Sequence, residues 1–356
     1  MGVGPRQARA LVERVDRCER EQPEYHSNMS SQVSHQVREG VLSLGKPFGL
    51  HHGGQLDALQ IGWRCVGNPD HPILVALGGI SAHRVVCDAS EPANGWWNTM
   101  VGPGAPIPSD RYRILSFDYL GGSGHTTGPQ DSLAFPSVST FDQAELLHLV
   151  MDHLEIEAVH AFVGASYGGM VGLAFAERYP QQLQRLIVLS AAHRTHPMAT
   201  AWRSVQRRIV RLGHQLGDTR SALALARGLA MSTYRTPAEF LQRFAGEARH
   251  TAEGAVFPVE EYLLARGEQY AARYAAGSFV TLSESIDLHR IDPTRINVPV
   301  SALAVRSDQL VPLEDMRQLA AALPSCRLTE IDSIFGHDAF LKEPQQLRPF
   351  FAQSLG

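Results

Sequence analysis

Gly164-Ala165-Ser166-Tyr167-Gly168 forms a Gly-x-Ser-x-Gly pentapeptide that lies between an apolar run at residues 158–163 and a helix-like stretch at 169–179. An apolar run of this length, followed by a helix, predicts a buried strand. Small residues around Ser166 let the chain turn sharply from strand to helix, and this turn holds the hydroxyl above the edge of the sheet. A hydroxyl held in this way acts as a nucleophile, so the pentapeptide in its setting predicts covalent acyl chemistry.

Composition and charge limit the classes of fold, partner and cofactor that the chain can have. The 356 residues are enough for one large α/β domain that carries an insertion. A formal net charge of −4 provides no basic field for nucleic acid or for an anionic membrane. The 16 histidines are scattered and no pair shows metal-site spacing, so we expect no metal ion.

The cysteines and the N-terminus bear on location. Cys18, Cys65, Cys87 and Cys326 are dispersed and form no Cys-x-x-Cys motif, which predicts free thiols in a reducing compartment. No stretch is apolar for long enough to span a bilayer, and the charged N-terminus lacks the apolar core of a signal peptide. We therefore expect a cytoplasmic protein without a membrane partner.

The alternation of strand-like and helix-like stretches divides the chain into three parts. We expect residues 1–46 to form an N-terminal extension, with a short charged helix over 7–21 and a polar stretch over 27–36. Residues 47–192 and 292–356 alternate between strands and helices, which predicts a mostly parallel sheet flanked by helices on both faces. The predicted strands span 72–77, 112–117, 158–163, 186–189, 298–305 and 327–331, and residues 55–66 alternate like antiparallel strands at a sheet edge.

Residues 193–291 interrupt this alternation. They carry repeated helix-like stretches and no convincing strand, which predicts a helical cap (lid) inserted into the α/β core. The predicted helices span 202–216, 219–231, 237–248, 260–274 and 280–289. Because ligands bind at the carboxyl ends of parallel strands, we expect the cap to narrow the entrance to the site.

A serine nucleophile needs a base, and the base needs an orienting acid. Asp308 follows the predicted strand at 298–305, and His337 follows the one at 327–331. Taken alone, an aspartate in a turn usually stabilises the turn by hydrogen bonds to the backbone, and a Gly-His pair is often only part of a loop. Their order after Ser166, each at the end of a strand, predicts a catalytic triad of Ser166, Asp308 and His337.

The negative oxygen of a tetrahedral intermediate needs two backbone N–H donors. We expect one from Tyr167, the residue after the nucleophile, and the second from Leu77 or Gly78. The glycines of residues 76–80 let the backbone approach closely where the first core strand ends. The alternative is that this run is a plain strand-ending turn.

Several short motifs occur in a fixed order along the chain. They are Gly95-Trp96-Trp97, Val101-Gly102-Pro103-Gly104, Asp110-Arg111-Tyr112, the loop at 120–129, the serine loop at 164–170, Ser204-Val205-Gln206-Arg207, Tyr234-Arg235-Thr236, the stretches 257–263 and 283–287, and the loop at 336–341. Together they resemble the homoserine O-acyltransferase family of α/β-hydrolase enzymes, over roughly residues 47–350. Two departures from the family lie in the serine loop: Tyr167 replaces a frequent methionine and Ala165 a frequent glycine, and we expect both to line or border the acyl pocket. In addition, residues 123–126 are unusual within their loop, and the N-terminal forty residues are extra.

The resemblance implies an α/β-hydrolase fold and further site residues. Arg235 matches the family's arginine that clamps the amino-acid carboxylate, Asp338 matches the acid that receives the ammonium group, and Tyr234 belongs to the same substrate-binding segment. The implied reaction is a two-step transfer from acyl-CoA, as acetyl-CoA or succinyl-CoA, to the hydroxyl of L-homoserine in methionine biosynthesis. Acyl-CoA would be a cosubstrate rather than a bound cofactor, and the protein would be a homodimer that pairs through cap helices.

Three alternatives stay open from the sequence. The pentapeptide and triad do not separate a transferase from an esterase or amidase that uses water. A related transferase could act on serine or on a natural-product hydroxyl. A non-catalytic binding protein of this fold would lack part of the triad, and all three members are present here.

Overall fold

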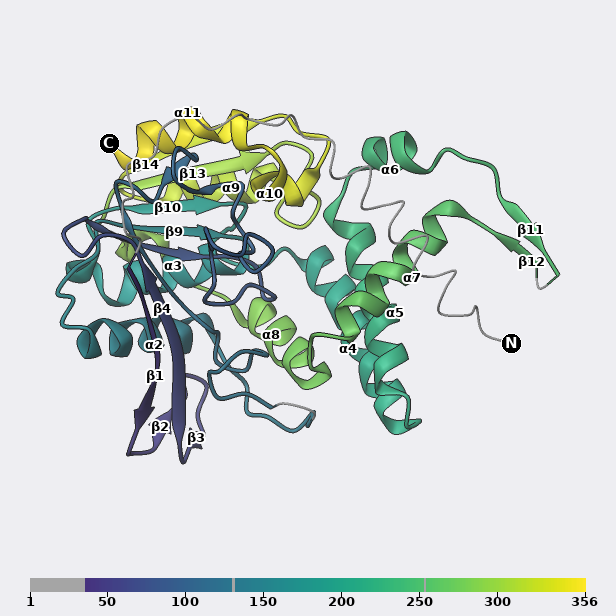
Figure 1. Cartoon of the computed structure of the whole chain (residues 1–356), viewed down its shortest axis with the longest axis horizontal. Helices are drawn as coiled ribbons and strands as arrows, with labels where there is room; N and C mark the ends of the chain where they lie inside the picture. Colours follow the sequence, from purple (N-terminus) through teal and green to yellow (C-terminus); the bar gives the residue numbers. More distant parts are fainter. Residues whose placement is uncertain (1–35, 130–131, 253) are drawn as a thin grey trace.

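The predicted core strands and one strand that was not predicted form an eight-stranded sheet in a computed structural model that describes residues 36–129, 132–252 and 254–356 (Figure 1). In spatial order the strands are β1 (Val37–Leu44), β4 (Leu59–Val66), β8 (Arg113–Phe117), β5 (Ile73–Leu77), β9 (Ala161–Ala165), β10 (Leu186–Leu189), β13 (Val300–Val305) and β14 (Cys326–Ile331). β4 pairs antiparallel with β1 and β8, and from β8 to β14 all pairs are parallel. The parallel part therefore presents several carboxyl ends at one edge.

β1 lies within the residues that we predicted as an N-terminal extension. Its residues pair with β4 from Val37 opposite Val66 to Leu44 opposite Leu59. No residue of β1 is fully buried, and its apolar and polar residues do not alternate regularly, so the sequence signal of this edge strand is weak. The helix predicted over 7–21, and the polar stretch at 27–36 apart from Gln36, lie outside the described residues.

The strands in the middle of the sheet are apolar on both faces because helices cover both. Val75 and Leu77 of β5 pack with α2 (Thr140–His153) and α3 (Tyr167–Arg178). Leu74 and Ala76 of the same strand lie in a second cluster that includes α11 (Pro344–Leu355). Figure 1 shows α2 and α3 on one side of the strands and α11 on the other. Burial on both faces explains why these strands are continuous apolar runs rather than alternating ones.

A helical segment lies between β10 and β13 and forms the cap beside the carboxyl edge of the sheet (Figure 1). It contains α4 (Pro197–Gln215), α5 (Thr219–Tyr234), α6 (Pro237–Phe244), α7 (Pro258–Ala271) and α8 (Ala276–Leu288). Close backbone packing joins these helices: a Cβ on Gly213 would lie 2.1 Å from that of Ala222, and one on Gly267 would lie 2.2 Å from the carbonyl oxygen of Ala224. α8 connects cap and core, because Phe279 packs in the cap cluster and Leu282 in the main core.

The expectation that residues 193–291 contain no strand is wrong. The cap carries a small hairpin, β11 (Arg249–Thr251) and β12 (Gly254–Val256), and α6 ends at Phe244 rather than at 248. Each strand has only three residues and nearly all of them are exposed, so no burial imposes an alternating pattern that a sequence could show.

The remaining elements are short and connect the main ones. They are β2 (Phe48–Gly49), β3 (Gln55–Leu56), β6 (Val101–Gly102), β7 (Ile107–Pro108), α9 (Leu313–Ala322), α10 (Ala339–Lys342) and the 3₁₀ turns η1 (Pro180–Gln182), η2 (Pro293–Arg295) and η3 (Gly336–Asp338). No helix in the described part of the chain is long and apolar enough to cross a membrane.

Candidate active site

Ser166 stands at the turn from β9 to α3 in a conformation that few residues adopt. Its φ of 54° and ψ of −122° place it in the positive-φ region, where a side chain is strained. A Cβ on Gly164 would lie 2.3 Å from the carbonyl oxygen of Gly168, and one on Gly168 would lie 2.3 Å from that of Leu77. Both glycines are therefore required for the tight turn that the pentapeptide predicts.

The structure brings the three residues of the predicted triad together. Ser166 Oγ lies 2.8 Å from His337 Nε2, and His337 Nδ1 lies 2.7 Å from Asp308 Oδ2. The other oxygen of Asp308 accepts backbone N–H groups from Leu310 at 2.8 Å and Val311 at 3.0 Å, which fixes the carboxylate. Because a carboxylate oxygen accepts, Nδ1 carries the proton and Nε2 is free to accept one from the serine hydroxyl.

The surroundings of His337 set its proton affinity. Burial opposes the charged imidazolium, but the Asp308 charge and its hydrogen bond, together with the Asp338 charge, outweigh burial and raise the pKa of His337 above 6.5. Arg203 acts in the opposite direction. His337 is therefore a stronger base than a free imidazole, at the cost of becoming protonated at a higher pH.

A cavity of about 230 Å³ lies over Ser166 and His337, between the sheet edge and the cap. The core contributes apolar and glycine residues such as Gly79, Trp96 and Met170, and the cap contributes polar residues from α4, α5 and α8. The nucleophile thus faces an enclosed space with a mixed lining, as a site for small polar substrates requires.

The structure favours Gly79 over Leu77 and Gly78 beside the nucleophile. Leu77 ends β5 with its side chain buried, and the carbonyl of Gly78 accepts hydrogen bonds from Tyr119 Oη at 2.7 Å and from Gly168 N at 2.8 Å. In a trans peptide the N–H points opposite to the carbonyl, so the Gly79 N–H is directed away from these two donors. Among these three residues only Gly79 lines the cavity. Leu77 and Gly78 were predicted because the sequence does not show where the strand ends.

Tyr167 also differs from the expectation drawn from the family. Its side chain is fully buried, its hydroxyl lies 2.7 Å from Ser285 Oγ, and its ring packs edge-on against Tyr119. Tyr167 is absent from the residues that line the cavity. The larger side chain is accommodated in the core beneath the nucleophile, and only the backbone of Tyr167 remains available to a substrate.

Two of the three predicted substrate-binding residues line the cavity. Asp338 follows His337 directly, and Tyr234, the last residue of α5, has its ring 6.2 Å from that of His337. Burial raises the pKa of Asp338 above its usual range, although Arg235 and His337 oppose this. A buried carboxylate beside the base is suited to receive a cationic group.

Arg235 does not lie in this cavity. It lines a second pocket next to it, and its Nη1 lies 2.5 Å from Glu239 Oε1, while its Nε lies 3.4 Å from Asp338 Oδ2. Glu239 is only 2% exposed, so the guanidinium of Arg235 is engaged in a buried ion pair within the protein. Arg235 therefore lies beside the cavity rather than in its lining, because α5 ends at Tyr234 and the backbone of Arg235 is extended.

Arg227 is the cation that the sequence reasoning missed. It lines the cavity together with Ser166, its Nη1 donates to Tyr234 Oη at 3.2 Å, and its guanidinium lies over the rings of Tyr234 and Tyr270. Within the described part of the chain, no ion pair joins Arg227 to a carboxylate at hydrogen-bonding distance. A spacing of seven residues from Tyr234 places both on one face of α5, which is the signal that could have identified it.

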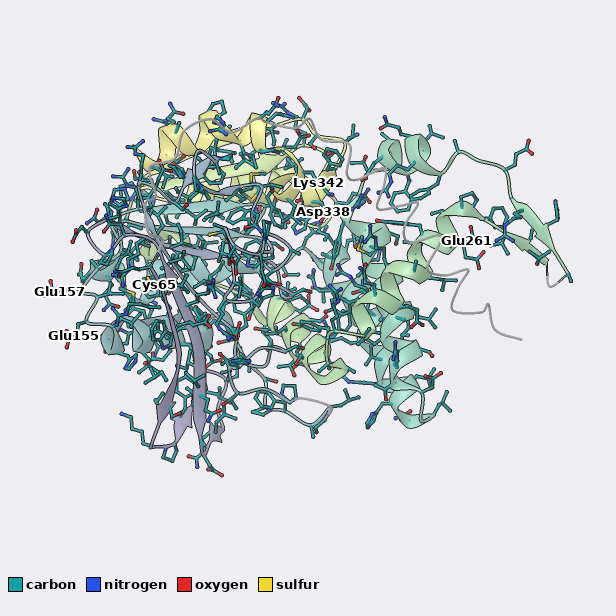
Figure 2. All side chains as sticks on the ribbon, in the orientation of Figure 1. Cys65, Glu155, Glu157, Glu261, Asp338 and Lys342 are labelled. Carbon is teal, nitrogen blue, oxygen red and sulfur yellow. The ribbon has the colours of Figure 1, made fainter. Side chains whose placement is uncertain are left out.

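The second pocket opens beside the cavity and shares Arg227, Asp338 and several core residues with it. Its lining also contains Arg273 and Lys342, both exposed. Figure 2 shows Asp338 and Lys342 on the core where it meets the cap. Because this pocket borders the cavity of the nucleophile and carries exposed basic side chains, it is here called the basic entrance.

No group of three or more His, Cys, Asp or Glu side chains is arranged to hold a metal ion in residues 36–129, 132–252 and 254–356. The cysteines that lie in these ranges, Cys65, Cys87 and Cys326, are free thiols.

Comparisons with known proteins show the fold class and the family of the chain. The chain matches the family described as alpha/beta hydrolase fold over residues 77–344. It is 42% identical over 318 residues to a homoserine O-succinyltransferase of Xanthomonas campestris pv. campestris, covering 89% of this chain and 83% of the relative. It is 30% identical over 360 residues to a serine O-succinyltransferase of Litchfieldella anticariensis, covering 88% of this chain and 97% of the relative. A solved structure of homoserine O-acetyltransferase from Bacillus anthracis has a TM-score of 0.83 at 18% identity, covering 90% of this chain and 98% of that one.

The sheet order and the position of Ser166 at a strand-to-helix turn are those of the α/β-hydrolase class. Within this class the chain belongs to the homoserine O-acyltransferase family. It is therefore an acyltransferase.

Proposed function

We propose that the protein transfers an acyl group from an acyl-CoA to the side-chain hydroxyl of L-homoserine, through an acyl-serine intermediate on Ser166. The observation that carries this proposal is the placement of Arg227, Tyr234 and Asp338 around a complete Ser–His–Asp arrangement. A hydrolase needs only water at this position, whereas an amino-acid acceptor needs both an anion site and a cation site.

In the first step, Ser166 Oγ attacks the thioester carbonyl while its proton moves to His337 Nε2. The N–H groups of Tyr167 and Gly79 hold the negative oxygen of the tetrahedral intermediate. The intermediate collapses, the C–S bond breaks, and the CoA sulfur leaves with the proton from His337. Asp308 stabilises the imidazolium during this step.

In the second step, homoserine enters the space that CoA has left. Its carboxylate binds Arg227 and its ammonium group binds Asp338, which directs the hydroxyl toward the acyl-serine. His337 removes the hydroxyl proton, the oxygen attacks the acyl carbon, and Ser166 leaves with that proton. The cap limits access of water, which would otherwise hydrolyse the acyl-enzyme.

The test measures CoA release with and without homoserine. Transfer predicts rapid release when homoserine is present and, in its absence, one equivalent of CoA followed by slow turnover. Full-rate release without an acceptor would identify an esterase-type hydrolase instead. Serine, the acceptor named for the relative at 30% identity, is compared at equal concentration, and a higher kcat/KM for serine would move the proposal to that acceptor.

Arg227→Met is expected to raise the KM for homoserine by about 10- to 100-fold, because a charge-assisted hydrogen bond to the carboxylate is lost. Arg220→Met, on an exposed part of the same helix, is the matched control. Arg235→Met is expected mainly to lower the melting temperature, because Glu239 keeps only Arg243 at 3.2 Å. An unchanged KM for homoserine in Arg227→Met, together with a raised KM in Arg235→Met, would assign carboxylate binding to Arg235 instead.

The basic entrance is proposed to bind the phosphate groups of CoA. Charge reversal in Lys342→Glu or Arg273→Glu is expected to lower kcat/KM for acyl-CoA by about fivefold or more, relative to the acyl thioester of N-acetylcysteamine, which has no phosphates. Lys46→Glu, which changes the chain's other lysine at an exposed position between β1 and β2, is the control. An equal loss with both thioesters would exclude phosphate binding at this entrance.

We further propose a cytoplasmic homodimer that functions in methionine biosynthesis. Free thiols at Cys65, Cys87 and Cys326 suit a reducing compartment. On α4, Met198, Val205 and Leu212 recur every seven residues and are 52%, 48% and 57% exposed. This apolar stripe supports pairing of two caps. Sedimentation velocity is expected to give a mass twice that of the chain. A monomer at micromolar concentration would contradict the proposed homodimer.

A further inference from the structure

The cavity has two sides that differ in their polar groups. The acceptor side carries Arg227, Tyr234 and Asp338, which belong to α5 and η3. A second group of lining residues, here called the α4–α8 side, consists of Arg203 and Gln206 of α4 and Ser283 of α8. The mechanism above gives no role to these three residues.

The α4–α8 side has an excess of buried positive charge. Asp287 is shared by two arginines: its Oδ1 lies 2.7 Å from Arg203 Nη2 and its Oδ2 lies 2.6 Å from Arg207 Nη1. The three side chains are about one-tenth exposed, so one carboxylate balances two guanidinium groups away from bulk water. Arg194 and Asp315 also line the cavity and balance each other in charge. The side therefore keeps a net charge of one positive unit.

Two groups on this side have unused donors. Arg203 Nε donates a hydrogen bond to Asp287 at 2.8 Å, and its Nη2 contacts both Asp287 and Thr195. Its Nη1 makes no hydrogen bond within the described part of the chain. Gln206 is only 3% exposed and lines the cavity, and its side-chain amide has no hydrogen-bond partner among residues 36–129, 132–252 and 254–356. A buried amide without a partner is costly unless a ligand satisfies it.

We propose that the α4–α8 side binds a terminal carboxylate on the acyl group, so that the donor is the thioester of a dicarboxylic acid such as succinyl-CoA. This inference rests on the proposed acyl transfer through Ser166. In that reaction CoA and the acceptor use the entrance and the acceptor side in turn, which leaves the α4–α8 side of the cavity for the acyl group. There its carboxylate meets Arg203 Nη1 and the Gln206 amide, and neutralises the excess charge.

An acetyl group cannot make these contacts. It ends in a methyl group, which would leave both donors unpaired and the excess positive charge without a counter-ion. Arg203 and Gln206 therefore act as specificity-determining residues rather than as members of the triad.

The test compares donors that match in chain length. Succinyl-CoA and butyryl-CoA both carry four-carbon acyl groups, and only the first ends in a carboxylate. The wild-type protein is expected to prefer succinyl-CoA in kcat/KM with homoserine as acceptor. Arg203→Met is expected to lower the succinyl-to-butyryl ratio by about 10- to 100-fold. Asp287 keeps Arg207 in this variant, so no buried carboxylate is orphaned.

The ratio cancels effects that both donors share. Arg203 also lowers the pKa of His337, and its loss alters proton transfer equally for the two thioesters. Gln206→Met is a second variant, expected to lower the ratio without any change of charge. Arg211→Met, on the same helix but half exposed and paired with Glu284, is expected to leave the ratio unchanged.

The outcomes separate this inference from the proposed function. Homoserine-dependent transfer from acetyl-CoA or butyryl-CoA without any preference for succinyl-CoA would overturn the carboxylate site and leave acyl transfer standing. A lower ratio in Arg227→Met but not in Arg203→Met would also overturn it. Absence of transfer from every acyl-CoA would overturn both.

Discussion

Ser166→Ala is expected to abolish acyl-enzyme formation and to lower kcat/KM for acyl transfer by at least about 10⁴-fold. The hydroxyl is the only group that the substitution removes, and its oxygen lies 2.8 Å from His337 Nε2, the base that would take its proton. Alanine adopts the same backbone turn with no greater strain than serine, so the fold should persist. Mass spectrometry after mixing with acyl-CoA measures the effect, as an added acyl mass in the wild-type protein and none in the variant.

Ser190→Ala is the matched control for this experiment. Ser190 follows the neighbouring strand β10, also has a positive φ of 48°, and is buried with no hydrogen-bond partner for its hydroxyl within the described residues. It shares the strained geometry of Ser166 but has no base beside it. Ser190→Ala should therefore keep near wild-type activity. A Ser166→Ala protein that still acylates homoserine at the wild-type rate would refute the covalent mechanism.

The parts of the site that could be predicted are those whose chemistry depends on chain order. The Gly-x-Ser-x-Gly turn can form only where two glycines allow the backbone to pass, since Cβ atoms there would clash at 2.3 Å. Asp308 was predicted because it follows β13, a buried apolar strand, and such strands are a strong signal in a sequence. β14, which precedes His337, is a half-buried strand with polar residues, so His337 was predicted mainly from its place after Ser166 and Asp308 in the chain. The parallel core follows from the signal of the buried strands.

The residues that could not be predicted depend on where an element ends or which face it presents. Arg235 and Arg227 both belong to the α5 region, but the helix ends between them at Tyr234, and only the structure shows which guanidinium faces the cavity. Gly79 was missed because β5 ends at Leu77 and the next peptide is oriented by bonds to Tyr119 and Gly168. The burial of Tyr167 against Ser285 could not be predicted because the two residues are distant in sequence.

Asp308→Asn is expected to lower kcat/KM by about 10⁴-fold, an effect of the size that the same change has in serine proteases. The substitution preserves shape, and an asparagine oxygen can still accept from Leu310 and Val311. Its amide nitrogen, however, would donate to His337 Nδ1, which moves the ring proton to Nε2. That nitrogen could then no longer accept the proton of Ser166. Circular dichroism should show an unchanged fold, and Asp332→Asn, at an exposed position on the surface, is the control.

The pH profile distinguishes this explanation from a general loss of structure. In the wild-type protein the Asp308 charge and its hydrogen bond hold the pKa of His337 above 6.5 against burial. Only neutral His337 accepts a proton, so wild-type activity should fall as the pH drops through this raised pKa. Without the aspartate, burial and Arg203 dominate and lower the pKa, so the acid limb of the residual activity should move to lower pH. An acid limb that stays in place would show that Asp308 does not set the charge of His337.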